Sequence, residues 1–186
     1  MRKVIASEFV SLDGVMESPD KWHFPYFNDE MGEEIGAAMA AADAMLLGRV
    51  TYEEWAAFWP TQSNDDEIAS YMNNIRKFVV STTLDRVEWQ NSTLIKGVVA
   101  EEITRLKQQP GKDISISGSG TLVQSLLRDD LLDELRLMVH PIVVGSRKRL
   151  FEDGSYQKAL ELVDLKTFST GVVYLTYQPA EKEVEG

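Results

Sequence analysis

The sequence predicts an α/β fold in which helices cover both faces of a central mixed, mostly parallel sheet that ends in a C-terminal antiparallel hairpin. Short apolar runs alternate with amphipathic segments along most of the chain, as in crossover units of parallel strands. Two of these runs, ending at Leu47 and Ser117, pass through glycine directly into a helical segment. The last third contains two strand-like segments joined by Ser169-Thr170-Gly171, which is a hairpin signal.

Length and composition favour one domain. The chain has 186 residues, of which 44% are hydrophobic, and this is enough for one substantial core. We expect a single domain over residues 1–179 and a frayed, charged tail over residues 180–186. No apolar run is long enough to span a membrane, and the N-terminal residues lack the features of a signal peptide. We therefore expect a cytoplasmic protein.

Composition also excludes several kinds of chemistry. There is no cysteine, which excludes disulfides, thiolate metal ligands and cysteine nucleophiles. His23 and His140 are the only histidines, so we expect no metal site. The formal net charge of −11 argues against a nucleic-acid partner, because binding to a phosphate backbone needs a basic face. A local basic pocket for one small anion remains compatible with this charge.

The first strand is expected at residues 3–9, which are rich in apolar residues, and the turn residues Ser11-Leu12-Asp13-Gly14 end it. After a long loop, Asn28 is expected to cap a helix over residues 29–42. Carboxylates are concentrated in the first turns of that helix, where they suit the positive end of the helix dipole.

The loop between these two elements carries an unusual number of aromatic side chains: Trp22, Phe24, Tyr26 and Phe27. They are too many for a solvated connection. Two interpretations remain open. The rings cover an edge of the core, or they form the wall of a pocket for a flat ligand.

Residues 44–47 form a short apolar strand, and a helix over residues 51–58 follows and stops before Pro60. Gly48, Arg49 and Thr51 lie at this junction. Unpaired amides at a helix start favour anions, so the segment is a candidate phosphate site. Alternatively, Gly48 is present only for its backbone freedom.

A helix over residues 65–74 is expected from helical spacing of apolar residues, and these are interpreted as core: Ile68, Tyr71, Met72 and Ile75. Strands follow at residues 77–81 and 93–96, and a helix over residues 99–109 ends at a Pro-Gly pair. Ser81-Thr82-Thr83 comes at a strand end, where hydroxyls either bind a ligand or satisfy the turn backbone.

The second glycine junction gives a more specific prediction of a ligand site. Residues 113–117 are a strand, Gly118-Ser119-Gly120 is a tight turn, and residues 121–128 form a helix with leucines on one face. Small residues here allow a ligand to contact the backbone amides, which can hold a diphosphate. The segment is not the Gly-x-Gly-x-x-Gly dinucleotide fingerprint, because Val123 occupies the third glycine position.

The last third changes in character. Residues 132–139 alternate as a half-buried strand and lead into a loop that holds Arg147, Lys148 and Arg149. Two further strands, residues 160–168 and 171–178, complete the hairpin.

Several of these segments resemble a known family. Gly48-Arg49-Val50-Thr51-Tyr52-Glu53 resembles the Gly-Arg-x-Thr-Trp-Glu segment of dihydrofolate reductases, and Gly118-Ser119-Gly120 resembles their paired-glycine turn. The resemblance is closer to the reductase domain of the bifunctional riboflavin-biosynthesis deaminase-reductase and its stand-alone relatives. It rests there on Ser11-Leu12-Asp13-Gly14 and on the stretch from Asp133 through Pro141 and Gly145 to Phe151. It covers residues 2 to 178.

The resemblance implies a dihydrofolate reductase-like three-layer fold, NADPH as the cofactor and a homodimer. The cofactor-binding residues that it implies are Leu47, Gly48, Arg49, Thr51, Ser81, Thr82, Gly118, Ser119, Gly120, Thr121 and Leu122. Asp13 would be the proton donor or a substrate contact. The substrate-binding residues would be Gly14, Trp22, Phe24 and Phe27.

The chain also departs from both relatives. Folate reductases carry a carboxylate two residues after a Leu-Pro step, whereas here Phe27 follows the Phe24-Pro25 step. The zinc-binding deaminase part of the riboflavin enzyme has no counterpart. The sequence thus predicts an NADPH-dependent reductase that transfers a hydride to an unidentified small substrate, such as a pterin-like or pyrimidine-like compound, and argues against folate and the riboflavin precursor. The alternative is a dimeric nucleotide-binding protein of the same fold without efficient catalysis.

Overall fold

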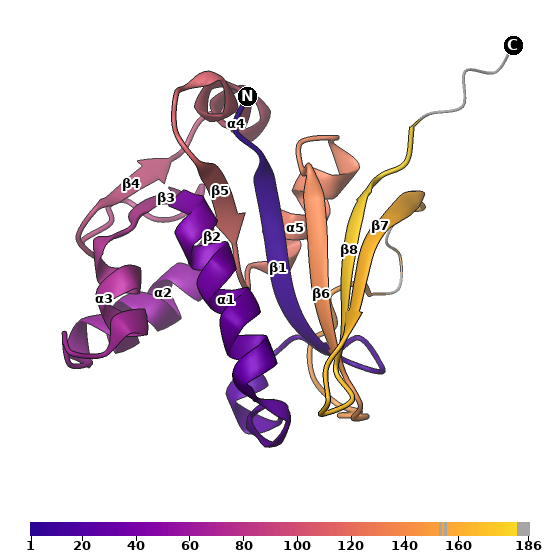
Figure 1. Cartoon of the computed structure of the whole chain (residues 1–186). Helices are drawn as coiled ribbons and strands as arrows, with labels where there is room; N and C mark the ends of the chain where they lie inside the picture. The colour runs from indigo at the N-terminus through magenta and orange to yellow at the C-terminus, as the bar shows by residue number, and fades with distance from the viewer. Residues whose placement is uncertain (153, 155, 182–186) are drawn as a thin grey trace, which may run out of the picture.

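The fold is built on one mixed sheet. The computed structural model describes residues 1–152, 154 and 156–181, and within them eight strands form the sheet in the order β4-β3-β2-β5-β1-β6-β8-β7 (Figure 1). The strands are β1 (Val4–Ser11), β2 (Ala42–Gly48), β3 (Arg76–Val80), β4 (Ser92–Ile95), β5 (Asp113–Ile116), β6 (Glu134–His140), β7 (Leu160–Thr167) and β8 (Val173–Pro179). The α-helices are α1 (Asp29–Ala41), α2 (Arg49–Phe58), α3 (Glu67–Asn74), α4 (Val99–Gln108) and α5 (Gly120–Arg128).

The strand directions confirm the predicted sheet. Neighbouring strands from β4 to β6 are parallel, whereas β8 is antiparallel to both β6 and β7. The chain therefore reverses only in its last third, where the hairpin was expected. Because β5 lies between β2 and β1, segments far apart in the sequence end side by side at the carboxyl edge of the sheet.

Helices cover both faces of the sheet. Alternate residues of β2 show this: Ala44 and Leu46 belong to the core cluster shared with α4 and α5, while Met45 and Leu47 belong to the cluster shared with α2 and α3. Figure 1 shows α1 in front of the sheet and α5 behind it. Within the described residues, no helix has the length and apolar content needed to cross a membrane.

Side-chain caps explain where two of the helices begin. Asn28 accepts a hydrogen bond from the amide of Met31 at 3.0 Å and caps α1, as predicted. Asp66 caps α3 by accepting from the amides of Ile68 and Ala69.

One core prediction was wrong. Ile68 is 47% exposed, and Ala69 occupies the buried position instead. The buried face of the short helix α3 runs through Ala69, Met72 and Asn73, so Ile68 lies one position off that face. The predicted tail over residues 180–186 lies mostly outside the described residues.

Candidate functional site

The two glycine junctions meet at the carboxyl edge of the sheet. The amide of Gly48, where β2 ends, donates a hydrogen bond to Ser119 Oγ at 2.9 Å. The amide of Ser119 in turn donates to Thr51 Oγ1 in the first turn of α2, also at 2.9 Å. Each hydroxyl accepts one bond, and each keeps its own hydrogen for a further acceptor.

Backbone geometry explains why small residues form the second turn. Gly118 has a φ of +64° and Ser119 a φ of +55°, so two consecutive residues adopt the left-handed conformation. A Cβ added at Gly118 would lie 3.1 Å from the side chain of Thr51. The turn therefore fits closely against the start of α2.

The helices that start at these junctions have no side-chain caps. Neither α2 after Gly48 nor α5 after Ser119 has a capping hydrogen bond from a side chain of the described residues, in contrast to α1 and α3. The first amides of each helix are thus left for water or for a ligand. Two helix starts held together in this way form a favourable position for an anion with two phosphate groups.

Two cations accompany these amides. Arg49 lies at the first position of α2 and forms an exposed ion pair with Glu53 at 2.8 Å. Lys148 reaches in from the loop before β7, and its Nζ donates to the hydroxyl of Thr121 at 3.1 Å. Thr121 is in the first turn of α5, so the chain supplies one cation at each helix start. Lys148 was not predicted; three successive basic residues in an acidic chain were the available signal.

The other predicted cofactor residues surround this junction. Val80, at the end of β3, pairs with Gly48 in the sheet, which brings Ser81 and Thr82 to the same edge. Ser81 Oγ accepts hydrogen bonds from the amides of Thr83 and Leu84, so this hydroxyl oxygen pairs with the backbone of the turn. Leu47 and Leu122 are buried in the two core clusters and support the turns from below.

Met16 lies over Gly120. A Cβ built on Gly120 would come within 2.5 Å of the Met16 sulfur. The missing Cβ of Gly120 therefore leaves room for the thioether of Met16, whose unbranched and flexible side chain fills this space.

Asp13 connects two loops through hydrogen bonds. Its carboxylate accepts from the Ser11 hydroxyl at 2.5 Å and from the amides of Val144 at 3.1 Å and Gly145 at 2.8 Å. The hydrogen bond from Ser11, followed by those from the two amides, lowers the pKa of Asp13 to about 2. At neutral pH this carboxylate is ionised and already bonded, which suits a structural role better than proton donation. The carbonyl of the neighbouring Gly14 accepts from the amide of Leu150 at 2.9 Å, in the same pair of loops.

The aromatic loop packs around both histidines on the α1 face. Trp22 is buried, and its ring lies 5.2 Å from that of His140, edge to face. His23 stacks on Phe9 at 4.7 Å. The rings of Phe24 and Phe27 pack beside His23 but are 64% and 49% exposed. The loop therefore covers an edge of the core and leaves two of its rings exposed, and a role of these rings in binding a flat ligand stays a prediction.

The two imidazoles were not predicted as site residues. Their rings are 5.8 Å apart, and both are buried. His23 Nδ1 and His140 Nε2 have no hydrogen-bond partner among the described residues. Burial lowers the pKa of each histidine, and the neighbouring His140 lowers that of His23 further. Both rings are therefore neutral at neutral pH.

Open depressions also occur elsewhere in the described part of the chain. One of about 620 Å³ lies at the amino ends of β2, β3 and β4, lined by residues such as Asp43, Tyr71 and Arg76. Another of about 180 Å³ lies between β4 and α4. Neither is lined by a predicted site residue. The uncapped starts of α2 and α5, with Arg49 and Lys148, lie outside both depressions.

Known proteins are similar to this chain over most of its length. The model of the RibD C-terminal domain family matches residues 2–174. The uncharacterized protein YyaP of Bacillus subtilis (strain 168) is 31% identical over 180 residues, which cover 95% of this chain and 94% of that protein.

Two solved structures show the fold. A Shewanella sp. PV-4 protein assigned to riboflavin biosynthesis superposes with a TM-score of 0.77 at 21% identity, covering 97% of this chain and 99% of that one. Dihydrofolate reductase from Enterococcus faecalis, complexed with NADP(H), superposes with a TM-score of 0.63 at 17% identity, covering 96% and 97%. The predicted dihydrofolate reductase-like fold is thereby confirmed.

Proposed function

Because the chain belongs to the RibD C-terminal domain family, we propose that it is an NADPH-dependent oxidoreductase that transfers a hydride to a small organic substrate. The observation that carries the proposal is the pair of uncapped helix starts, α2 and α5, joined by Ser119 and accompanied by Arg49 and Lys148. The phosphate groups of a dinucleotide need such amides and cations. NADPH supplies the hydride when bound, so the protein has only to bind, orient and exclude water.

Each predicted residue has a part in this proposal. The amides after Gly48 and Ser119 bind the diphosphate, and the free hydroxyl hydrogen of Thr51 can donate to a phosphate oxygen. Ser81 and Thr82 line the adenosine side. Gly118 and Gly120 shape the turn that holds the diphosphate, because their missing Cβ atoms leave room for Thr51 and Met16 against its backbone.

The proposed substrate lies on the α1 side, next to the aromatic loop. Trp22, Phe24 and Phe27, with Gly14 at the base of the loop, suit a flat ring such as a pterin or a pyrimidine. Asp29 and Glu30 lie two and three residues after the position of the folate carboxylate, and Glu30 accepts hydrogen bonds from Ser169. This contact favours a substrate other than folate.

One observation favours a second candidate function, a dimeric nucleotide-binding protein without efficient catalysis. Asp13 is ionised, and the two histidines are neutral with lowered pKa values. None of these three groups is a good proton donor at neutral pH. If substrate reduction needs an acid from the protein, it is not among them.

A homodimer is proposed for either function. β7 is an edge strand, and its side chains Leu162, Val163 and Leu165 are exposed. An exposed apolar edge strand is open to pairing with another chain. A second copy packed against β7 would cover these side chains without blocking the junction of α2 and α5, from which β7 is separated by several strands.

The test is a titration of NADPH followed by tryptophan fluorescence, since Trp55 is in α2 and Trp59 just after it, and the start of α2 forms part of the proposed site. We expect saturable quenching. No saturable signal up to millimolar NADPH would reject both candidates. If NADPH binds, its oxidation is then measured with pterins, flavin precursors, ketones and quinones. Turnover with any of these compounds supports the reductase, and no turnover with all of them supports the binding protein.

A further inference from the structure

A buried glutamate lies directly beneath the second glycine turn. Glu8 is on β1, between Ala6 and Val10 of the main core cluster, and faces the side of the sheet that α5 covers. Its side chain is only 4% exposed. A carboxyl group is rarely buried this deeply among apolar side chains unless it has a specific partner.

That partner is the turn. Glu8 Oε2 accepts a hydrogen bond from the amide of Gly118 at 2.9 Å. The other oxygen, Oε1, is buried and has no partner in the part of the chain that the structure describes. Burial raises the pKa of Glu8 well above its usual value, and the bond from Gly118 offsets only part of this effect. The carboxyl group therefore stays neutral at pH values where an exposed glutamate is ionised.

The contact holds a residue whose backbone is otherwise permissive. Gly118 and Ser119 both adopt the left-handed conformation, and each has its amide bound by a side chain from a different element. Glu8 holds the amide of Gly118 from β1, and Thr51 holds that of Ser119 from α2. The next two amides along the chain, those of Gly120 and Thr121, begin α5. Their direction follows from how the preceding two are fixed.

We propose that Glu8 is a positioning residue for the cofactor, which fixes the amide of Gly118 and thereby directs the first amides of α5 toward the diphosphate. The inference rests on the proposed function. A neutral carboxyl group is suited to this role because a negative charge beneath the turn would repel the bound phosphates. Glu8 acts through Gly118 and takes no part in the transfer of the hydride.

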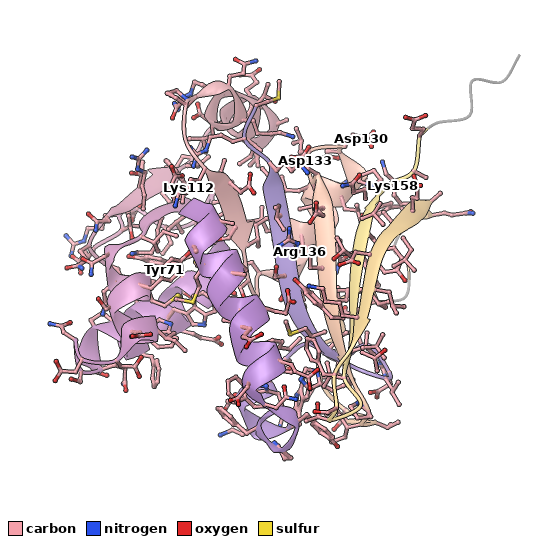
Figure 2. All side chains as sticks on the ribbon, in the orientation of Figure 1. Tyr71, Lys112, Asp130, Asp133, Arg136 and Lys158 are labelled. Atoms are coloured by element: carbon pink, nitrogen blue, oxygen red, sulfur yellow. The ribbon has the colours of Figure 1, made fainter. Side chains whose placement is uncertain are left out.

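The experiment compares Glu8→Gln with Glu8→Leu. Glutamine keeps the neutral acceptor for Gly118, whereas leucine fills the space without an acceptor and suits the apolar surroundings. We expect Glu8→Gln to bind NADPH within about threefold of the unaltered protein, and Glu8→Leu to bind at least about tenfold more weakly, as loss of a buried hydrogen bond predicts. The matched control is Glu134→Gln, which neutralises another buried glutamate, paired with Arg136 on β6 (Figure 2). NADPH affinity in this control should not change.

A second measurement needs no cofactor. Amide hydrogen exchange at Gly118 in the free protein should be slow in the unaltered protein and in Glu8→Gln, and faster in Glu8→Leu. Glu8→Met serves the same purpose if Glu8→Leu does not fold. Unchanged exchange and unchanged NADPH affinity in the apolar variant would overturn the inference, as would Glu8→Gln binding as weakly as Glu8→Leu. Absence of NADPH binding by the unaltered protein would instead reject the proposed function, while exchange at Gly118 still tests the contact.

Discussion

Ser119 Oγ accepts a hydrogen bond from the amide of Gly48 at 2.9 Å, and this contact joins the starts of α5 and α2. The two residues are far apart in the sequence but adjacent in space, because β5 pairs in parallel with β2. The bond therefore brings the starts of both helices together at the carboxyl edge of the sheet.

Ser119→Ala removes this bond and leaves the amide of Gly48 without its partner. We expect NADPH affinity to fall by roughly 1 kcal/mol, or about fivefold in Kd, because the two helix starts are no longer held together. Ser125→Ala, later in the same helix, is the control. Equal affinity in the two variants would show that the contact does not position the site.

The two cations at the helix starts should each contribute to binding. Arg49→Ala and Lys148→Ala each remove a charged donor, so we expect NADPH affinity to fall by about 1–3 kcal/mol in each variant. The difference should shrink at high salt, because exposed charges are screened. The control is Lys112→Ala: Lys112 donates to the carbonyl of Ala40 near the end of α1 (Figure 2), at the opposite edge of the sheet. If Lys148→Ala binds like Lys112→Ala, the proposed role of Lys148 is wrong.

The buried histidines predict a loss of stability in mild acid. The pKa values of His23 and His140 are lowered in the folded protein, whereas histidine in the unfolded chain titrates near pH 6.5. Below about pH 6.5 the unfolded state therefore binds protons at these two histidines that the folded state does not, and their contribution lowers the free energy of unfolding as the pH falls. Glu8, whose pKa is raised by burial, acts in the opposite sense, so the effect of a histidine is measured as a difference between variants. The aspartates and glutamates with lowered pKa values change the free energy of unfolding only at lower pH.

Urea unfolding at pH 7.5 and 5.5 measures this effect. His23→Phe keeps a ring stacked near Phe9 and removes one titrating group. Its stability should depend less on pH over this interval than that of the unaltered protein. The same pH dependence in both would mean that His23 has an unperturbed pKa.

The proposed dimer makes a separate prediction about β7. Leu165 is 53% exposed on this edge strand. Leu165→Lys should shift the protein from dimer to monomer in size-exclusion chromatography with light scattering, because a lysine on an edge opposes pairing between chains. Ile68→Lys, which changes a similarly exposed apolar residue on α3, should leave the dimer intact. A Leu165→Lys protein that remains dimeric would place the interface elsewhere.

Local patterns in the sequence predicted the elements of this fold well. The cap at Asn28 and the two strand-glycine-helix junctions depend on residues close together in the chain, and the structure has them where they were expected. Ile68 failed because its helix is short, and a shift of one position changes which face is buried.

Local patterns could not predict the partners of buried polar groups. Alternation along β1 places Glu8 on a buried face, but its partner Gly118 is 110 residues away. Asp13 is recognisable as a turn residue, while the amides that lower its pKa come from residues 131 and 132 positions further on. Whether an acid donates a proton, contacts a substrate or holds two loops together depends on such distant contacts, so the sequence alone left the role of Asp13 open between proton donor and substrate contact.

Lys77 provides the last prediction, because it is a buried cation that holds a helix end. It is fully buried on β3, and its Nζ donates to the carbonyls of Met72 and Ile75 at 2.8 Å and of Asn73 at 3.3 Å. The ammonium also lies 4.2 Å from the centre of the Trp89 ring. Burial lowers the pKa of Lys77 to about 8, so at pH 7 the charged form prevails.

Lys77→Met keeps the length and apolar stem of the side chain but leaves these carbonyls at the end of α3 without a donor. We expect the free energy of unfolding at pH 7 to fall by about 2–4 kcal/mol, since several buried acceptors lose a charged partner. Urea unfolding measures the change, and Lys96→Met, at an exposed lysine after β4, is the control. If Lys77→Met is as stable as the control, better apolar packing outweighs the lost bonds. α3 would then be held by its contacts with Trp89 and the rest of that core cluster rather than by the lysine.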